Sequence, residues 1–207
     1  EPRDVPPEGI HYRGTYTPAQ DEVILRRWKL PLVQRFARAN RIDRQTMGDA
    51  NAKLGIVCAG KTWHEVRLAL RALGLDEARA RAVGVAVYKV GLLWPLEPEG
   101  LAEFAAGKQE LFFVEDKAAF VESQAAAILY NQPVRPRITG KADEAGRPLL
   151  NADVGFEAIE LGLTIAARLQ SLGAGDDELQ RRVQALQAAR RTLLAVMAPA
   201  EAKRTPF

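Results

Sequence analysis

LGIVCA, residues 54–59, is a continuous apolar run with β-branched residues at its centre. A run without polar alternation is typical of a strand buried on both faces of a parallel sheet. A helix is predicted directly after it, over 62–73, with Thr62 and Glu65 as a capping box. This strand and helix form the first unit of a repeating pattern.

The same alternation continues outward along the chain. Further strands are predicted at 85–90, 111–114 and 137–139, and further helices at 76–83, 98–106 and 117–130. Strands that alternate with helices at this spacing imply right-handed crossovers and a parallel sheet. We therefore predict a three-layer α/β domain with a mainly parallel sheet over residues 53–142.

The flanking segments have a different character. Residues 1–52 read as an extended arm, a helix that begins at Thr17-Pro18 and is kinked or broken at Pro31, and a polar linker over 41–52. The apolar side of this helix carries Val23, Ile24, Trp28, Val33, Phe36 and Ala37. Residues 143–207 read as a turn-rich loop and two helices, over 153–172 and 176–197. The second helix is expected to carry an apolar stripe near heptad spacing, made of Leu179, Val183, Leu186, Leu193 and Met197.

Composition excludes several classes of protein. A single cysteine, Cys58, cannot form an intramolecular disulfide, which favours a reducing cytoplasm. The net charge is only +3, with 29 basic and 26 acidic residues mixed along the chain, and this argues against a nucleic-acid partner. No apolar run approaches the roughly 20 residues that span a membrane. The chain begins Glu1-Pro2 and ends Pro206-Phe207, and we expect it to be an internal piece of a longer protein.

One string imitates a phosphate-binding loop. GIVCAGKT, residues 55–62, matches G-x-x-x-x-G-K-[ST] letter for letter. In such a loop the strand precedes the first glycine, and the amides between the glycines cradle the phosphates. Here the residues between the glycines are themselves the predicted strand. We therefore interpret the match as accidental and keep a stand-alone nucleotide-binding or nucleotide-hydrolysing protein that uses Gly55–Thr62 as the alternative.

Three loops follow the predicted strands and meet at one edge of the sheet. Their candidate interface or ligand residues are Gly60, Lys61, Thr62, Gly91, Trp94, Pro95, Glu115, Asp116 and Lys117. We call the side of the sheet where the parallel strands end the carboxyl edge; ligands and neighbouring domains usually bind there. Two interpretations of these residues fit the sequence equally well: a contact surface for a partner domain or cofactor tail, and ordinary polar loop ends. A third hypothesis is a regulatory module that binds a small anion beside Lys61.

The remaining candidates for chemistry are weak. His11 and His64 have no cysteine or acid at ligand spacing, and Cys58 lies in the middle of a predicted strand, where it is expected to be inert. We therefore assign no catalytic, cofactor-binding or metal-binding residue. The sequence has no cysteine cluster for an iron–sulfur centre.

Several longer strings resemble the indolepyruvate ferredoxin oxidoreductase family, in its long fused bacterial form. They are DVPPEGIHYR (4–13), RFARANRIDR (35–44), LGIVCAGKTWHEVRLAL (54–70), YKVGLLWPLEPEGL (88–101), ELFFVEDKAAFVESQAAAILYN (110–131), GKADEAGRPLL (140–150) and KRTPF (203–207). Together they cover nearly the whole chain. The resemblance places this segment between the two thiamine-binding modules, where it is similar to the C-terminal domain of transketolase.

The resemblance also implies an activity for a parent enzyme. Members of the family oxidise 2-oxoacids with thiamine pyrophosphate and magnesium, pass electrons through iron–sulfur clusters to ferredoxin, and transfer the acyl group to coenzyme A. The implied partners are the neighbouring thiamine-binding domains, ferredoxin and further copies of the parent in a homo-oligomer. No cofactor or catalytic residue of the family maps onto this segment. The implied role is that of a non-catalytic structural and interface domain.

Overall fold

The computed structural model describes residues 5, 9–11, 13–133, 135–153, 155 and 157–201. The first part of the chain contains α1 (Pro18–Ile24), the π-helical turn η1 (Leu25–Lys29), α2 (Leu30–Ala39), β1 (Arg44–Met47), β2 (Leu54–Ala59), α3 (Gly60–Ala72) and α4 (Glu77–Val83). The second part contains β3 (Val85–Val90), α5 (Pro98–Ala105), β4 (Glu110–Val114), α6 (Val121–Leu129), β5 (Arg137–Thr139), α7 (Ala158–Ser171) and α8 (Asp177–Glu201). The string KRTPF (203–207) lies outside the described residues.

The strands form one sheet in the order β1-β3-β2-β4-β5. β2 is central and pairs in parallel with both β3 and β4, while β5 pairs in parallel with β4. Only β1 is antiparallel, and it pairs with β3 at one edge. The predicted α/β class with a mainly parallel sheet is confirmed.

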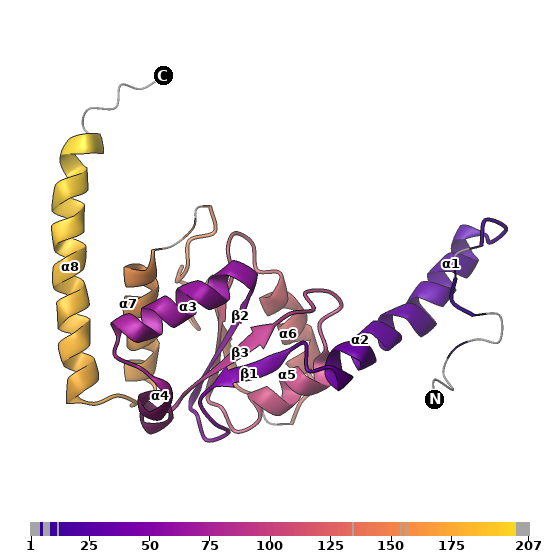
Figure 1. Ribbon diagram of the computed structural model, residues 1–207, viewed down its shortest axis with the longest axis horizontal. Coiled ribbons are helices and arrows are strands. Elements are labelled where there is room, and N and C mark those ends of the chain that lie inside the picture. The colour runs from indigo at the N-terminus through magenta and orange to yellow at the C-terminus, as the bar shows by residue number, and fades with distance from the viewer. Residues whose placement is uncertain are drawn as a thin grey trace.

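Helices cover both faces of the sheet, which gives three layers (Figure 1). On one face Leu54 and Ile56 pack with α3, α4 and α7, and on the other Val57 and Phe113 pack with α5 and α6. All four side chains are at most 1% exposed. Burial of side chains of this size stabilises the fold by roughly 1.5–3 kcal/mol each.

Gly55 lies where α5 approaches β2 most closely. A Cβ atom at this position would lie 2.7–2.8 Å from side-chain atoms of Leu111, Lys108 and Phe104. Real Cβ contacts are longer than this, so a larger residue would have to displace these three side chains. The glycine is therefore required by packing within the strand.

The segment predicted as a polar linker, 41–52, contains the edge strand β1. Its residues, RQTM, lack the apolar run or alternation that reveals a buried strand, and they are exposed or half-buried. Gly48 follows β1 at φ +77°, and a Cβ there would lie 2.1 Å from the carbonyl oxygen of Val85. The linker prediction is thus wrong at β1, because an edge strand needs little apolar sequence.

The N-terminal helices project from the body of the domain (Figure 1). Thr17 forms the predicted capping box with Gln20. A kink or break was predicted at Pro31: the chain stays helical there, but the π-helical turn η1 ends at Lys29 and a new α-helical segment, α2, begins at Leu30 with Pro31 in its first turn. Because the arm extends beyond the sheet, Val23 and Phe36 are 47% and 59% exposed, contrary to prediction, whereas Ala37 is buried as expected.

The two C-terminal helices pack beside the sheet (Figure 1). α7 contributes Leu161, Ile165 and Leu169 to the same core as β2, and α8 packs on α7 through Leu179 and Leu186. Leu193, expected on the same stripe of α8, is 43% exposed because the helix continues past α7. The side chain of Met197, placed on that stripe by the sequence, lies outside the described residues.

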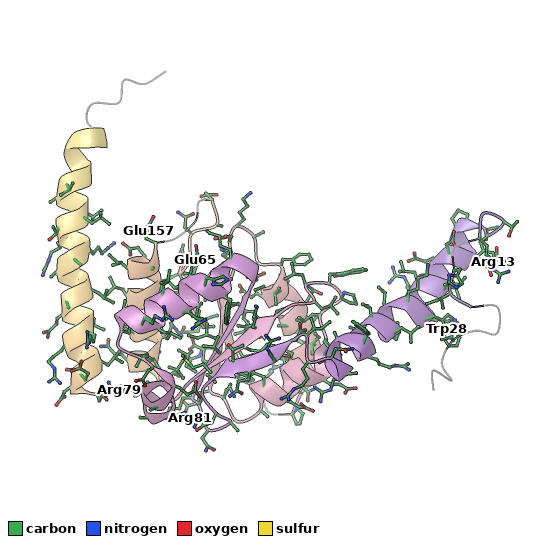
Figure 2. The ribbon with its side chains drawn as sticks, viewed as in Figure 1. Arg13, Trp28, Glu65, Arg79, Arg81 and Glu157 are labelled. Carbon is green, nitrogen blue, oxygen red and sulfur yellow. The ribbon has the colours of Figure 1, made fainter. Side chains whose placement is uncertain are left out.

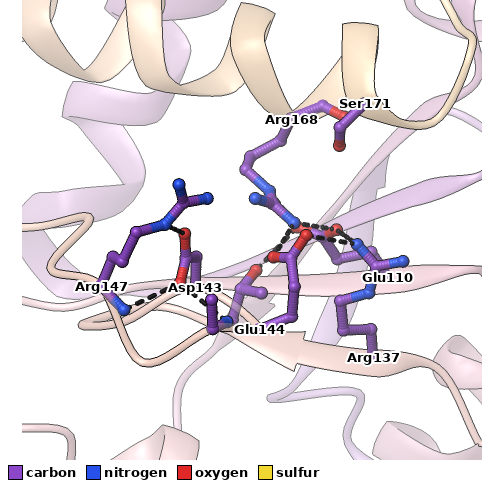
Figure 3. Close-up of polar contacts among 9 residues, drawn as sticks. Glu110, Arg137, Asp143, Glu144, Arg147, Arg168 and Ser171 are labelled. Carbon is purple, nitrogen blue, oxygen red and sulfur yellow. Dashed lines mark hydrogen bonds and ion pairs between the residues drawn. The ribbon is translucent and has the colours of Figure 1, made fainter.

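A buried ion cluster fixes α7 at the amino edge of the sheet, where the parallel strands begin (Figure 3). Glu110, fully buried at the start of β4, accepts hydrogen bonds from Arg168 Nε and Nη2 of α7, each at 2.7 Å, and from Thr139 Oγ1 of β5 at 2.7 Å. Glu144 accepts from both Arg168 (2.8 Å) and Arg137 (3.0 Å). We call these five residues the amino-edge cluster.

The neighbouring turn is held separately. The carboxylate of Asp143 accepts from the backbone N–H groups of Ala145 and Arg147 and from the guanidinium of Arg147 (Figure 3). These bonds lower the pKa of Asp143, the backbone bond from Arg147 being the main cause. The turn therefore presents Glu144 to the amino-edge cluster in one orientation.

Candidate site at the carboxyl edge of the sheet

The loops after β2 and β4 meet at the point where the strand order reverses. β3 lies on one side of β2 and β4 on the other, so adjacent crossovers run in opposite directions. In open α/β sheets a crevice forms at the carboxyl ends of such strands. The structure brings Lys61 and Asp116 together there, with Lys61 Nζ 3.5 Å from Asp116 Oδ2.

Gly60 and Thr62 form the turn from β2 into α3. Gly60 has φ +50°, which glycine adopts without strain, and the helix begins at this residue without an intervening loop. The Thr62 hydroxyl accepts from the backbone N–H of Ala59 (3.2 Å) and lies within donor distance of the carbonyl oxygens of Ala59 (2.9 Å) and Val114 (2.8 Å). Thr62 therefore joins the ends of β2 and β4.

The predicted capping box of Thr62 and Glu65 is wrong. Because α3 starts at Gly60, Thr62 lies inside the first turn and Ala59 occupies the N-cap position. Glu65 pairs instead with Lys61, Oε1 to Nζ at 2.7 Å. This pairing, more than the nearby Asp116, raises the pKa of Lys61.

The charge of Lys61 is balanced within the domain. Its side chain is 68% exposed, yet it contacts two carboxylates, those of Glu65 and Asp116. Glu65 Oε2 and Asp116 Oδ1 are buried and have no hydrogen-bond partner among the described residues. A lysine that already faces two acids is poorly placed to bind a phosphate.

The phosphate-loop interpretation is not supported by the geometry of β2. Ile56 is in register with Val87 of β3 and Phe112 of β4, and the pairing continues through Cys58 on both sides. Amides that take part in two strand ladders cannot also surround an anion. The prediction that 56–59 is a buried strand is confirmed.

Glu115 and Lys117 set the start of α6. The Glu115 carboxylate accepts from the backbone N–H groups of Phe120, Val121 and Glu122 at 2.7–3.2 Å. Lys117 has φ +55°, outside the helical region. For this reason α6 begins at Val121, four residues later than the predicted start at Lys117.

Lys141 and Glu122 also lie at this edge, although sequence reasoning did not select them. Lys141 Nζ donates to the carbonyl oxygens of Glu115 and Asn151, and its backbone N–H donates to Glu122 Oε2 at 3.2 Å. Burial lowers the pKa of Lys141 and raises that of Glu122. Lys141 follows β5 closely, as Lys61 follows β2, and this shared position was the signal that would have found it.

The loop after β3 forms a separate part of the edge. The Asp43 carboxylate accepts from the backbone N–H groups of Gly91 (2.7 Å) and Leu92 (2.8 Å). Trp94 is 55% exposed and precedes Pro95 through a cis peptide bond. Among the described residues, no hydrogen bond or ion pair joins Gly91, Trp94 or Pro95 to Lys61.

Gln124 of α6 connects this loop to the start of its own helix. Its amide nitrogen donates to the carbonyl oxygens of Leu93 (2.9 Å) and Phe120 (3.2 Å), and its oxygen accepts from the Leu96 backbone N–H at 3.0 Å. Leu93, Trp94 and Phe120 are each about half exposed, at 47%, 55% and 51%. We call these three residues the apolar patch.

The described residues offer little for a metal ion or cluster. Within them, no group of three or more histidine, cysteine, aspartate or glutamate side chains is arranged to hold a metal. Burial raises the pKa of the Cys58 thiol to about 12, so this cysteine stays protonated. None of the helices in this part of the chain has the length and apolar character needed to cross a bilayer.

Comparison with known proteins identifies the family. The model of the indolepyruvate oxidoreductase domain matches residues 44–193. The chain belongs to this family. The resemblance noted in the sequence is confirmed. The match begins at β1, the strand that the sequence interpretation took for a linker, and ends within α8.

Relatives of this indolepyruvate oxidoreductase domain are longer proteins. The indolepyruvate oxidoreductase subunit IorA of Methanothermobacter marburgensis is 28% identical over 115 residues, which are 56% of this chain and 17% of that protein. The 2-oxoglutarate:ferredoxin oxidoreductase of Magnetococcus marinus matches 81% of this chain and 26% of its own, at 19% identity and a TM-score of 0.45. The match to a split-gene transketolase covers 61% of this chain and 41% of the transketolase chain, at 18% identity and a TM-score of 0.41.

Proposed function

We propose that this domain is a non-catalytic structural and interface element of a thiamine pyrophosphate-dependent 2-oxoacid:ferredoxin oxidoreductase. The 2-oxoacid is indolepyruvate or another arylpyruvate. The domain positions neighbouring thiamine-binding domains of the same enzyme, which acts in the cytoplasm as a homo-oligomer and delivers electrons to ferredoxin. Family membership supports the parent activity, and the carboxyl edge supports the role of the domain within it.

The observation that carries the proposal is the contrast between polar and apolar groups at the carboxyl edge. Lys61 is paired with acids, Thr62 is bonded to strand ends, and Glu115 caps α6. The apolar patch at the same edge remains about half exposed. An edge where Lys61, Thr62 and Glu115 are bonded within the domain, while apolar side chains are half exposed, suits protein contact better than chemistry.

The cofactors of the proposed parent do not fit the residues described here. Thiamine pyrophosphate with magnesium needs acids free to hold a cation and amides free to bind a diphosphate, and an iron–sulfur cluster needs several thiolates. In this domain Glu65 and Asp116 already pair with Lys61, and the amides of β2 lie in strand ladders. The only cysteine is a buried thiol in the middle of β2. We therefore assign the cofactors, and coenzyme A as co-substrate, to other domains of the parent and derive no step through them.

The division of the chain into 1–52, 53–142 and 143–207 is part of the proposal. Both flanking segments add to the fold of the middle segment: β1 from the first extends its sheet by pairing with β3, and α7 from the last packs on α3. The arm and the C-terminal helices would then connect the domain to the modules before and after it.

Activity of the complete enzyme tests the proposal. Turnover of indolepyruvate with coenzyme A and a viologen acceptor is measured for Trp94→Ser, with Tyr130→Ser as a matched control at another exposed aromatic residue, 69% exposed at the end of α6. We expect Trp94→Ser to lower kcat several-fold and to increase cleavage between domains by a protease, since small misplacements of catalytic modules are costly. The control is expected to change neither.

Two results would contradict this proposal. Unchanged turnover and unchanged proteolysis in Trp94→Ser would remove the interface role. Loss of turnover in a folded Lys61→Ala enzyme would place a catalytic residue in this domain. The nucleotide-binding alternative predicts micromolar binding of Mg-ATP that Lys61→Ala abolishes, measured by calorimetry.

A further inference from the structure

Two adjoining clefts lie between α3, the start of α4 and the edge strand β1. Their volumes are about 410 and 320 Å³, and they share Met47, Arg67 and Glu77 as lining residues. Ligand sites in proteins commonly have volumes of roughly 300–1,000 Å³. We call the joined clefts the α3 groove.

Two arginines of the α3 groove have no acidic partner. Arg67 and Arg71 lie one turn apart on α3, both are exposed, and neither forms an ion pair with any residue that the structure describes. Other arginines close by are paired: Arg79 with Asp176, Arg81 with Glu77, and Arg182 with Glu178. Like charges four residues apart on a helix repel, so an anion between Arg67 and Arg71 would relieve this repulsion.

The acids of the groove are already engaged. Asp76 accepts from the backbone N–H of Arg79 and caps α4. Glu77 pairs with Arg81 at 2.8 Å and accepts from the backbone N–H of Gly48 at 3.3 Å. With Arg81 counted, three arginines, Arg67, Arg71 and Arg81, face the two carboxylates of Asp76 and Glu77, so the groove and its rim carry a net charge of +1.

The inner wall of the groove is apolar and aromatic. Met47, Trp63 and Leu75 contribute to it. The indole N–H of Trp63 donates to Thr46 Oγ1 at 3.2 Å, which fixes the ring against β1. The guanidinium carbon of Arg67 lies 4.9 Å and Nζ of Lys89 lies 4.3 Å from the centre of that ring, so the ring contacts two cations and also orients Arg67.

We propose that the α3 groove binds a small organic anion, with an apolar body against Met47 and Leu75 and a phosphate or carboxylate group between Arg67 and Arg71. Arginine suits this role because its planar fork binds either group with two parallel hydrogen bonds. This site is separate from the carboxyl edge and does not rest on the proposed function of the domain.

Calorimetry on the full chain tests the site with defined probes. Phenyl phosphate and benzoate carry both an apolar body and an anionic group, inorganic phosphate carries only the anionic group, and benzyl alcohol carries only the body. We expect phenyl phosphate or benzoate to bind, the stronger of the two identifying the preferred group. Phosphate alone is expected to bind at least about tenfold more weakly, and benzyl alcohol not measurably.

Variants then locate the bound probe. Arg67→Gln and Arg71→Gln should each weaken binding about tenfold, since each removes a charge-assisted contact. Arg181→Gln, at an arginine of α8 paired with Glu178, makes the same charge change elsewhere and should leave binding unchanged. Thermal unfolding of each variant verifies that it is folded, as expected for exposed side chains. Absence of binding at millimolar probe, or equal binding by the Arg67→Gln/Arg71→Gln double variant, would overturn the proposal.

Discussion

The two edges of the sheet both carry clustered charges, but they use them differently. At the amino edge Glu110 is fully buried and both of its carboxylate oxygens accept hydrogen bonds. At the carboxyl edge Lys61 is 68% exposed, and one oxygen each of Glu65 and Asp116 is buried without a hydrogen-bond partner among the described residues. The amino edge thus satisfies the oxygens of its buried carboxylate within the domain, whereas the carboxyl edge leaves two buried carboxylate oxygens without a partner among the described residues.

The largest effect on stability is expected when the amino-edge cluster loses its main ion pair, between Glu110 and Arg168. Arg168→Met leaves the buried Glu110 carboxylate with only the longer ion pair to Arg137, at 3.7 Å, and we expect the free energy of unfolding to fall by about 3–5 kcal/mol. Urea denaturation measures the loss. The double variant Glu110→Leu/Arg168→Met should recover much of it, because no unpaired charge remains. A loss below about 1 kcal/mol in Arg168→Met would show that the cluster does not hold α7.

Thr62→Val tests the connection between β2 and β4 at the other edge. The valine cannot donate to the carbonyl oxygens of Ala59 and Val114, and we expect a loss of about 1–2 kcal/mol in the same urea measurement. Thr192→Val is the control, since the Thr192 hydroxyl donates only within the exposed surface of α8. Equal effects at the two positions would argue against a special role for Thr62.

The half-buried carboxylate of Glu122, at the carboxyl edge, should make stability depend on pH. Burial raises its pKa in the folded protein above the ordinary value of 4.5, so the folded state binds the proton more tightly than the unfolded state. The contribution of Glu122 to the free energy of unfolding is therefore most favourable below pH 4.5, and it is lost as the pH rises through the pKa of the folded state.

Glu122→Gln removes this dependence. We expect it to be more stable than the parent at pH 7 by a few tenths of a kcal/mol, with the advantage disappearing at pH 4. Urea denaturation at the two pH values measures the difference, and Glu157→Gln at an exposed carboxylate is the control. A variant that is less stable at pH 7 would show that the charge of Glu122 stabilises the fold.

The smallest effect is expected for Lys61→Ala. Because its ion pairs are exposed to solvent, removal of the lysine should leave the urea midpoint nearly unchanged, and less affected still in 1 M salt. Neither the parent nor the variant should bind Mg-ATP in calorimetry. Binding by the parent that the variant loses would revive the phosphate-loop interpretation.

The sequence predicted the centre of the sheet well because its signal is local. Ile56 and Val57 pack on opposite faces, and such strands need apolar residues at every position. β1 was missed because Arg44 and Gln45 are exposed and its pairing with β3 is a long-range property. An edge strand can be polar, so composition does not reveal it.

The candidate site was predicted only in part. Position after a strand selected Lys61 and Asp116, which the structure brings together. It did not reveal that Glu65 would pair with Lys61, nor that Glu110 and Arg168 would meet across 58 residues of sequence. Partners of charged side chains depend on how the helices pack, and a single sequence does not encode that packing in any short pattern.

The glycine at position 55 has a consequence for how short motifs arise. Its missing side chain leaves room for α5, Gly60 permits a sharp turn, and Thr62 ties two strands, so three unrelated mechanical demands select three letters of the string. A scan that compares only letters sees a nucleotide signature. Lys61, the fourth fixed letter, meets none of these demands, so a layered domain under the same three demands needs only one more coincidence to display that signature without ever meeting a nucleotide.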